Sequence, residues 1–328
     1  MRTLTPAPPR LRAPSGAVAF GSYQGEVGDV DFAPGLVARA VRHKRWVYGA
    51  IVAEALYVGW AVVRLGYASK LFAFAYDAND KRIVSVASRL GPPGVARVGR
   101  SSRAAPAAAW SLGRDRVRFG ARAGGGRSLS LAVGDVAADL AIDDGPPAIT
   151  AICALEDPDA GSPGASLTEK GALLPARGTI TIAGRAREVD ALAAYDYTSG
   201  ILQRRTAWRW AFFMGRDAAG APVAMNLVGG FMGEAECAFF TADGVFPLGE
   251  GRFTTTKPLD PWSIETSCGA AKLRFQPEAE HAEEQNLGLV KSLFHQPVGT
   301  FSGEVRVGGR TFEIRDVLGV CEDQSVVW

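Results

Sequence analysis

The sequence predicts an all-β protein in which two barrels, or two strongly bent antiparallel sheets, pack together. Gly and Pro are plentiful, with 39 and 19 among 328 residues, and they separate short runs of β-branched and aromatic residues. No long segment shows a helical period. The chain is also longer than the roughly 250–300 residues at which single hydrophobic cores stop growing, so two units are expected.

Several segments predict individual elements. Residues 34–41, PGLVARAV, predict a short helix. Residues 115–133, DRVRFGARAGGGRSLSLAV, predict two strands joined by a glycine-rich loop. Residues 236–248, ECAFFTADGVFPL, predict a hairpin with its turn at Asp243-Gly244, a residue pair favoured in two-residue hairpin turns.

One hairpin-like segment occurs twice. GTITIAGRAREVD at 178–190 resembles GEVRVGGRTFEIRD at 303–316, an offset of 125 residues (303 − 178). Unrelated hairpins use similar strand and turn residues, so chance similarity is the alternative to an internal duplication. Acidic residues follow each copy in a turn-like context, Asp196 after the first and Glu322-Asp323 after the second. We predict an N-terminal tail at 1–20 and two β-barrel domains, at 21–195 and 196–328, with Asp196 at their junction.

The composition excludes several functional classes. The net charge is only +2, with 36 basic and 34 acidic residues, so neither nucleic acid nor an anionic membrane is an expected partner. The apolar stretch 49–68 is interrupted by Glu54 and Arg64, which argues against integral membrane association. The four cysteines lie far apart, so no zinc site or disulfide framework is expected. The start of the chain has no secretion signal, and a reduced, cytoplasmic protein is predicted. Nucleotide and metal motifs are absent, so we predict no cofactor and no metal.

The segment 194–215, AYDYTSGILQRRTAWRWAFFMG, contains the main site candidates. Asp196 lies between Tyr195 and Tyr197. It either caps a turn or serves as a general acid, with a pKa raised by an aromatic, poorly hydrated site and with the two phenols orienting it. In the strand that follows, a period of two places Trp208 and Trp210 on one face and Arg209 on the other. The tryptophan face either packs in the core or lines a ligand pocket.

Four further residues are candidates, each with a structural alternative. Lys170 is a ligand-binding candidate or a surface charge. Asn226 lies in an apolar strand, where it either ties strands together or binds ligand. Glu236 is a second catalytic carboxylate or the partner of an arginine from 204–209. His295 is an acid or base candidate, because histidine titrates near neutral pH, or a structural residue.

Several motifs resemble a known family. LTEKGALLPARGTI, AYDYTSGILQRRTAWRWA, AMNLVGGFMGEAECAFF, FHQPVGTFSGEV and DVLGVCEDQSVVW occur in the order seen in the DUF2804 domain family of bacterial proteins. The layout is more distantly similar to double-lipocalin proteins, which include carotenoid hydratases, tocopherol cyclase and cyclases of natural-product pathways. This resemblance implies two lipocalin-like barrels with an apolar pocket. It implies no particular reaction, because a fold does not fix a function.

Two functions follow as hypotheses. The first is binding of a hydrophobic small molecule, such as a lipid, an isoprenoid or a polyketide-like compound, in an aromatic-lined pocket. The alternative is a cofactor-independent hydratase, cyclase or isomerase in which Asp196 is the general acid. The catalytic hypothesis requires that Asp196 and a second polar group, such as Glu236, Asn226 or His295, converge on one pocket.

Overall fold

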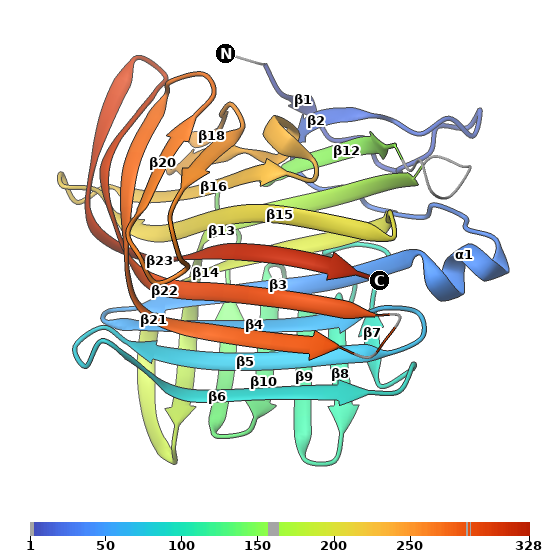
Figure 1. Cartoon of the computed structure of the whole chain (residues 1–328), viewed down its shortest axis with the longest axis horizontal. Coiled ribbons are helices and arrows are strands. Elements are labelled where there is room, and N and C mark those ends of the chain that lie inside the picture. Colours follow the sequence, from blue (N-terminus) through green and yellow to red (C-terminus); the bar gives the residue numbers. More distant parts are fainter. Residues whose placement is uncertain (1–2, 157–163, 287, 289) are drawn as a thin grey trace.

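The structure is a computed structural model that describes residues 3–156, 164–286, 288 and 290–328. Nearly all regular elements in these ranges are β-strands, and almost all pair antiparallel (Figure 1). The short helix α1 (Leu36–Val41) confirms the helix predicted at 34–41. A one-turn helix η1 (Gly233–Glu236) follows later in the chain. No helix in the described ranges has the length and apolar character needed to cross a membrane.

The strands before residue 202 form the first sheet, and those from residue 205 form the second. The first sheet contains β1 (Thr5–Pro6), β2 (Gly21–Gln24), β3 (His43–Ala53), β4 (Leu56–Arg64), β5 (Ser69–Asp77), β6 (Arg82–Gly91), β7 (Ala96–Val98), β8 (Ala108–Leu112), β9 (Asp115–Ala121), β10 (Arg127–Val133), β11 (Val136–Ile142), β12 (Ile149–Leu155), β13 (Gly164–Ile182) and β14 (Arg185–Ile201). The second contains β15 (Arg205–Arg216), β16 (Pro222–Gly230), β17 (Ala238–Thr241), β18 (Gly244–Pro247), β19 (Gly251–Thr254), β20 (Trp262–Thr266), β21 (Ala271–Asn286), β22 (Lys291–Val307) and β23 (Arg310–Val327).

The central strands of the two sheets have the same order. The main path of the first is β6-β5-β4-β3-β14-β13-β11-β10-β9-β8-β7, and that of the second is β18-β17-β16-β15-β23-β22-β21-β20-β19. In each sheet the last strand of the unit returns to pair with its first long strand, β14 with β3 and β23 with β15. The repeated sequence segment forms the hairpin β13–β14 in one sheet and β22–β23 in the other.

The two hairpins share a backbone detail that explains their recurring glycine. Gly178 pairs with Val189, and Gly303 pairs with Ile314 at the corresponding place. Their φ angles are +144° and +140°, a region that favours glycine. A Cβ on either residue would lie 2.1 or 2.3 Å from a carbonyl oxygen of the neighbouring strand. The glycine is therefore required at this point of each hairpin, where the adjacent strand leaves no space for a Cβ.

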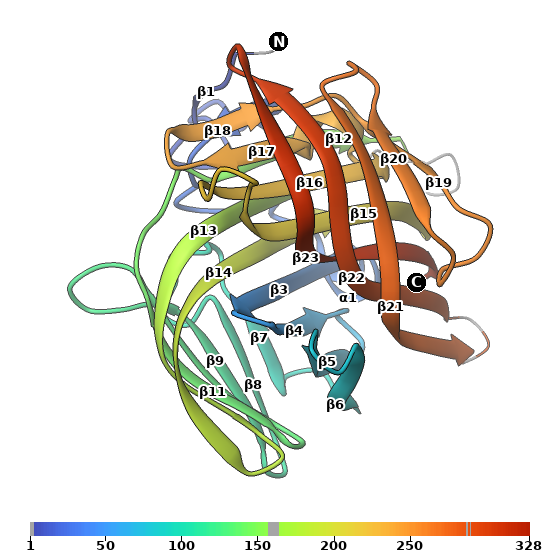
Figure 2. The same ribbon diagram turned by 90° about the vertical axis from the view of Figure 1, so that its left-hand side faces the viewer.

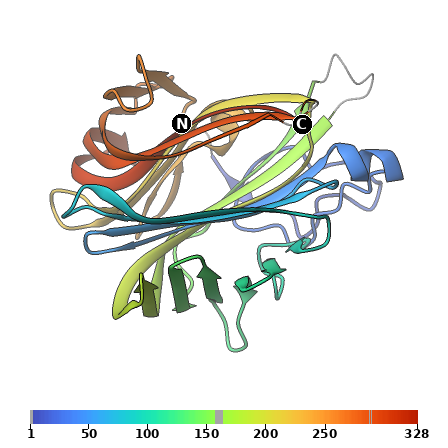
Figure 3. The same ribbon diagram turned by 60° about the horizontal axis from the view of Figure 1, so that its bottom comes forward.

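The sheets curl and pack as half-barrels. Figure 3 shows the yellow-to-red second sheet above the blue-to-cyan strands β3–β6, with the teal-to-green strands β7–β11 beneath them. Figure 2 shows the hairpin β13–β14 curving from the upper layer down to the lower one. One hydrophobic core fills the space between the sheets, and another lies inside the curl of the first sheet. Alternate residues of β3 face these two cores, since Tyr48 belongs to the first and Val47 to the second.

Several expectations need correction. The hairpin formed by β17 and β18 is confirmed, but Gly244 pairs with Thr241, so the turn residues are Ala242 and Asp243. Asp196 does not lie in a turn: it lies inside β14, which continues to Ile201. That strand therefore runs through the predicted boundary between 195 and 196, and the two-domain division stays a prediction.

Candidate functional site

A partly open cavity of about 150 Å³ lies between the two sheets. Its walls come from β3, β4, β5, β13 and β14 of the first sheet and from β15, β16, β21, β22 and β23 of the second. Most of the lining is aromatic or aliphatic, and the aromatic side chains are Trp46, Tyr48, Phe72, Trp208, Trp210, Phe231, Phe294 and Trp328. The pocket is thus suited to an apolar small molecule.

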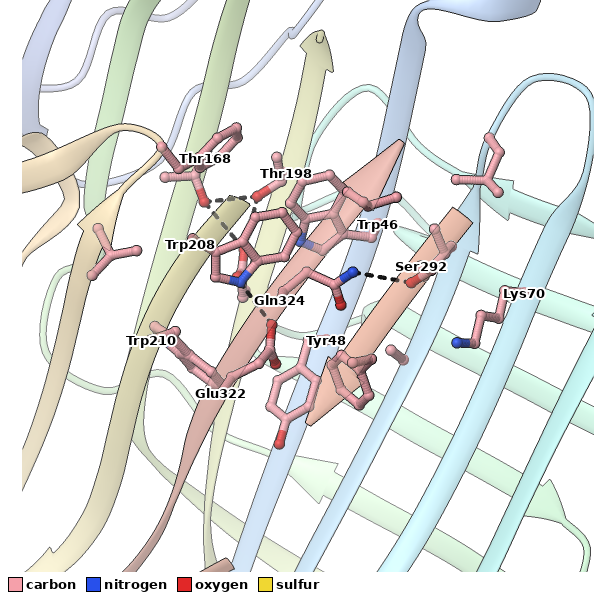
Figure 4. Close-up of a pocket in the computed structure, with 18 of the residues that line it drawn as sticks. Trp46, Tyr48, Lys70, Thr168, Thr198, Trp208, Trp210, Ser292, Glu322 and Gln324 are labelled. Carbon is pink, nitrogen blue, oxygen red and sulfur yellow. Dashed lines mark hydrogen bonds between the residues drawn. The ribbon is translucent and has the colours of Figure 1, made fainter. Parts of the chain in front are cut away.

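Aromatic side chains from the two sheets meet in this pocket (Figure 4). Trp46 of β3 and Trp208 of β15 are stacked, with ring centroids 6.2 Å apart and an angle of 13° between the ring planes. Tyr48 and Trp210 meet edge to face at 5.3 Å. These rings form a rigid apolar wall that contributes large contact area at low entropic cost.

A buried group of three charges lies on the wall of the same pocket. The Lys170 ammonium, on β13, is 2.5 Å from Asp196 Oδ2 on β14 and 3.1 Å from Glu236 Oε2 in η1. Thr168 and Thr198 donate hydrogen bonds to Asp196 Oδ1 at 3.2 and 2.9 Å. All five side chains line the pocket, so the charges border the space that a ligand would fill.

The environment perturbs two of these charges. Burial alone would lower the pKa of Lys170, but the carboxylates of Asp196 and Glu236 raise the pKa above its ordinary value. Burial raises the pKa of Glu236, against the opposing effect of Lys170. Among the described residues, Glu236 Oε1 has no hydrogen-bond partner although the residue is only 1% exposed. This oxygen is an acceptor available to a donor group on a ligand.

A fourth ionisable group, Glu322 of β23, lines the pocket from the second sheet. Trp208 Nε1 donates to Glu322 Oε1 at 2.7 Å, and Gln296 Nε2 donates to Glu322 Oε2 at 2.8 Å. Burial raises the pKa of Glu322 to about 7, and the nearby Asp196 contributes to the rise against the two hydrogen bonds. A general acid that acts near neutral pH requires a pKa raised in this way.

The four polar side chains at the centre of the site occupy matching places in the two hairpins. Lys170 and Asp196 are bonded across β13 and β14 and lie 26 positions apart in sequence, and Gln296 and Glu322 are bonded across β22 and β23 with the same separation. Lys170 thus corresponds to Gln296, and Asp196 corresponds to Glu322.

The aromatic residues match in the same way. Trp46 pairs with Thr198 and Tyr48 with Asp196, while Trp208 pairs with Gln324 and Trp210 with Glu322. Each ring therefore contacts its counterpart from the other half, and the pocket lies where equivalent faces of the two sheets meet.

The structure brings five of the predicted site residues together. Asp196, Glu236, Lys170, Trp208 and Trp210 all line the pocket. The tryptophan face of β15 therefore lines a pocket as well as contacting the core. The prediction that Glu236 pairs with an arginine from 204–209 is wrong, because its partner is Lys170.

The other five predicted residues lie elsewhere. Tyr195 and Tyr197 face the core of the first sheet, because neighbours of Asp196 in a strand point to its opposite face. Arg209 pairs with Asp323 outside the pocket at 3.0 Å. His295 pairs with Glu280 at 2.9 Å, also away from the pocket. Asn226 supports the site indirectly, since its Oδ1 accepts a 2.6 Å hydrogen bond from Trp210 Nε1.

The outer contacts of the two tyrosines explain why they cannot orient Asp196. Tyr195 Oη donates to Glu169 Oε1 at 2.8 Å, and Tyr197 Oη donates to the Gly99 carbonyl at 2.9 Å. Both bonds lie on the far side of β14. Sequence proximity to the carboxylate therefore gave the wrong partners, and the alternation of strand faces is the reason.

The sequence interpretation missed Glu322, Gln296, Trp46 and Tyr48. A signal for Glu322 was present, because it follows the second copy of the repeated segment as Asp196 follows the first. Trp46 and Tyr48 alternate within a strand just as Trp208 and Trp210 do. Only the pairing of β3 with β14 and of β15 with β23 shows that these pairs correspond.

Comparisons with known proteins agree with this architecture. The model of the family described as domain of unknown function DUF2804 matches residues 3–328, so the chain belongs to that family. A comparison with curated protein sequences found no match.

Solved structures share the fold at low sequence identity. A protein described as an AttH from Nitrosomonas europaea is 12% identical, with a TM-score of 0.54, over 87% of this chain and 92% of its own. Kievitone hydratase from Nectria haematococca is 12% identical, with a TM-score of 0.53, over 94% of this chain and 97% of its own. At this identity the likeness shows the lipocalin-like double-barrel fold alone.

Proposed function

We propose that this member of the DUF2804 family is an enzyme that binds an apolar, ring-containing small molecule between its two sheets and transfers a proton to it from Glu322. The observation that carries the proposal is the placement of this buried carboxyl on the wall of an aromatic pocket, with a pKa raised by burial to about 7. Buried ionisable groups add little to stability, so a group of them around a cavity supports a chemical role.

The proposed step is general acid catalysis. The O–H bond of Glu322 breaks as its proton moves to an alkene or carbonyl group of the ligand. The carboxylate that forms keeps the hydrogen bonds from Trp208 Nε1 and Gln296 Nε2. Positive charge that develops on the ligand is favoured by the surrounding aromatic rings and by the new Glu322 carboxylate, while the carboxylates of Asp196 and Glu236 offset the nearby Lys170 ammonium. Water adds to the cation in a hydration, a second π bond of the ligand adds in a cyclisation, and neither adds in an isomerisation. In each case the product loses one proton to the Glu322 carboxylate, which restores the acid.

In this proposal the general acid is Glu322, whereas the sequence had suggested Asp196. Asp196 accepts hydrogen bonds from one ammonium and two hydroxyl groups, an arrangement that suits a carboxylate rather than a proton donor. The name of one structural neighbour, kievitone hydratase, is compatible with proton-initiated chemistry in this fold.

The second candidate is a protein that binds an apolar molecule without changing it. The predominance of aromatic and aliphatic side chains in the pocket favours this function. It differs from the first in that Glu322 would contribute only to the shape and polarity of the site.

Deuterium transfer separates the two candidates. Wild-type protein is incubated in heavy water with a panel of aryl-substituted alkenes and conjugated enones, and carbon-bound deuterium is measured by mass spectrometry. The matched control is Asp323→Asn, because Asp323 neighbours Glu322 but lies on the opposite face and pairs with Arg209. Incorporation by wild type and Asp323→Asn, but not by Glu322→Gln, supports the enzyme. Incorporation that survives Glu322→Gln contradicts it, and binding without any incorporation supports the second candidate.

A further inference from the structure

The pocket has a second buried lysine near it, and this lysine differs from Lys170. Lys44 of β3 is 0% exposed. Its ammonium donates one hydrogen bond, to the Leu65 carbonyl oxygen at 3.0 Å. Among the described residues no carboxylate pairs with it, whereas Lys170 pairs with two.

Aromatic rings cover the Lys44 ammonium in place of a counter-ion. The ring centroid of Tyr67 lies 4.2 Å from Lys44 Nζ, and a ring of Trp328 lies 5.3 Å away. Burial alone lowers the pKa of Lys44 to about 7, without a charged neighbour that compensates. A buried ammonium with unused N–H donors is costly, so its retention points to a partner that arrives from outside the chain.

The position of Lys44 connects it to the pocket. It lies on the same face of β3 as Trp46 and Tyr48, which line the cavity, because these residues alternate along the strand. Leu65 and Trp328, which contact its ammonium, also line the cavity. Lys44 is therefore one layer behind the pocket wall, separated from the cavity by side chains.

We propose that Lys44 binds the anionic head group of the ligand, and that the ligand is an elongated apolar acid with a carboxylate or a similar anion at one end. The inference rests on the proposed function, since it assigns the substrate class of the same pocket. The ligand carboxylate displaces the Trp328 ring and accepts hydrogen bonds from Lys44 Nζ.

The proposal fixes the approximate length of the ligand. Lys44 and Tyr48 are four residues apart on one strand, which corresponds to about 13 Å. The apolar body then extends from Lys44 past the Trp46–Trp208 stack, and the far end reaches the region of Tyr48, Asp196 and Glu322. The head group determines orientation, and the far end receives the proton.

A second, more polar cavity does not offer a comparable site for a ligand anion. It is lined by Glu26, Arg103, Arg127 and Asp144 near Tyr195, and its arginines already pair with its carboxylates. A ligand anion there would compete with carboxylates of the chain. Lys44 has no such competitor among the described residues.

The test compares dodecanoate with its methyl ester by isothermal titration calorimetry at pH 6. These probes differ in the head group and share the apolar chain. We expect the wild type to bind the acid about ten- to a hundredfold more tightly, the range expected for hydrogen bonds to a charged group. Lys44→Met should bind both probes with equal affinity and should leave the affinity for the ester unchanged.

Two controls make the result specific. Lys272→Met removes a lysine that does not line the pocket and forms an exposed 3.6 Å pair with Glu265, so it should keep the preference for the acid. Thermal unfolding of Lys44→Met should show a melting temperature no lower than that of the wild type, because a buried cation is replaced by an apolar side chain of similar length.

The outcomes separate this inference from the proposed function. Equal binding of acid and ester by the wild type, or a preference that persists in Lys44→Met, overturns the head-group assignment and leaves the pocket as a binding site. Failure of the wild type to bind either probe also overturns the head-group assignment, whereas the proposed function, which concerns ring-containing ligands, is overturned only by the deuterium-transfer experiment.

Discussion

Replacing Lys170 with methionine should destabilise the fold by about 3–5 kcal/mol near neutral pH, the usual cost of removing one partner of a buried ion pair. Lys170 is the cation that contacts both Asp196 and Glu236, at 2.5 and 3.1 Å. Without it, Glu236 is left almost fully buried beside a second carboxylate. Methionine keeps the length and apolar packing of the side chain, so the loss reports mainly on the two carboxylates.

The assay is urea unfolding followed by tryptophan fluorescence, with the free energy of unfolding obtained by linear extrapolation. Lys272→Met is the matched control, since Lys272 forms an exposed 3.6 Å pair with Glu265 and its loss should cost well under about 1 kcal/mol. Adding Asp196→Asn and Glu236→Gln to Lys170→Met should recover much of the lost stability, because no buried charge then lacks a partner. A loss below about 1 kcal/mol for Lys170→Met would refute the reasoning, as would a triple variant less stable than the single one.

Three further predictions follow from named positions. Gly178→Ala and Gly303→Ala should each lower the free energy of unfolding by more than about 1 kcal/mol in urea titrations, since both glycines have positive φ and no room for a Cβ, whereas Gly35→Ala in open space should have little effect. Lys44→Met should be stabilising by up to about 5 kcal/mol below pH 7, because a pKa lowered from 10.5 to about 7 destabilises the folded state there, and the gain should disappear as pH rises toward 10.5 in pH-dependent unfolding. The infrared difference spectrum between wild type and Glu322→Gln should contain a protonated carboxyl band that is lost with a midpoint near pH 7, and a midpoint near pH 4.5 would contradict the assignment of Glu322 as the acid.

Much of the fold can be predicted from the sequence because the patterns that indicate strands and turns are local. Alternating apolar residues, turn residues and the repeated hairpin sequence all act over a few positions, and the helix α1, the strand pair β9–β10 and the hairpin β17–β18 were predictable from them. The similar sequences at 178–190 and 303–316 also form hairpins of the same register. The order of the strands in each sheet depends on long-range pairings that no local pattern contains.

The site was harder to predict from the sequence, because its residues are brought together by long-range strand pairings. Asp196 and Trp208 lie within one segment, 194–215, but the residues that join them in the pocket are distant in sequence. Lys170 reaches Asp196 across 26 residues, and Glu322 reaches Trp208 across 114. Tyr195 and Tyr197 were assigned to the site by adjacency alone, although neighbours in a strand face opposite sides. Chemistry in a β-protein is therefore better sought at alternate positions and across paired strands than within a short segment.

The correspondence between the two halves explains how one pocket acquires two different carboxyl groups. Asp196 and Glu322 occupy matching positions, and the side chains bonded to them across the hairpin are Lys170 and Gln296. An ammonium supplies a positive charge with its hydrogen bond, whereas an amide supplies a hydrogen bond without charge. The first arrangement holds a carboxylate as one member of an ion pair, and the second leaves burial to dominate and raises the pKa of Glu322 to about 7. The lysine in one half and the glutamine in the other thus distinguish the two equivalent positions: Asp196 has a cationic partner, whereas Glu322 has a neutral one and the raised pKa on which its proposed role as proton donor rests.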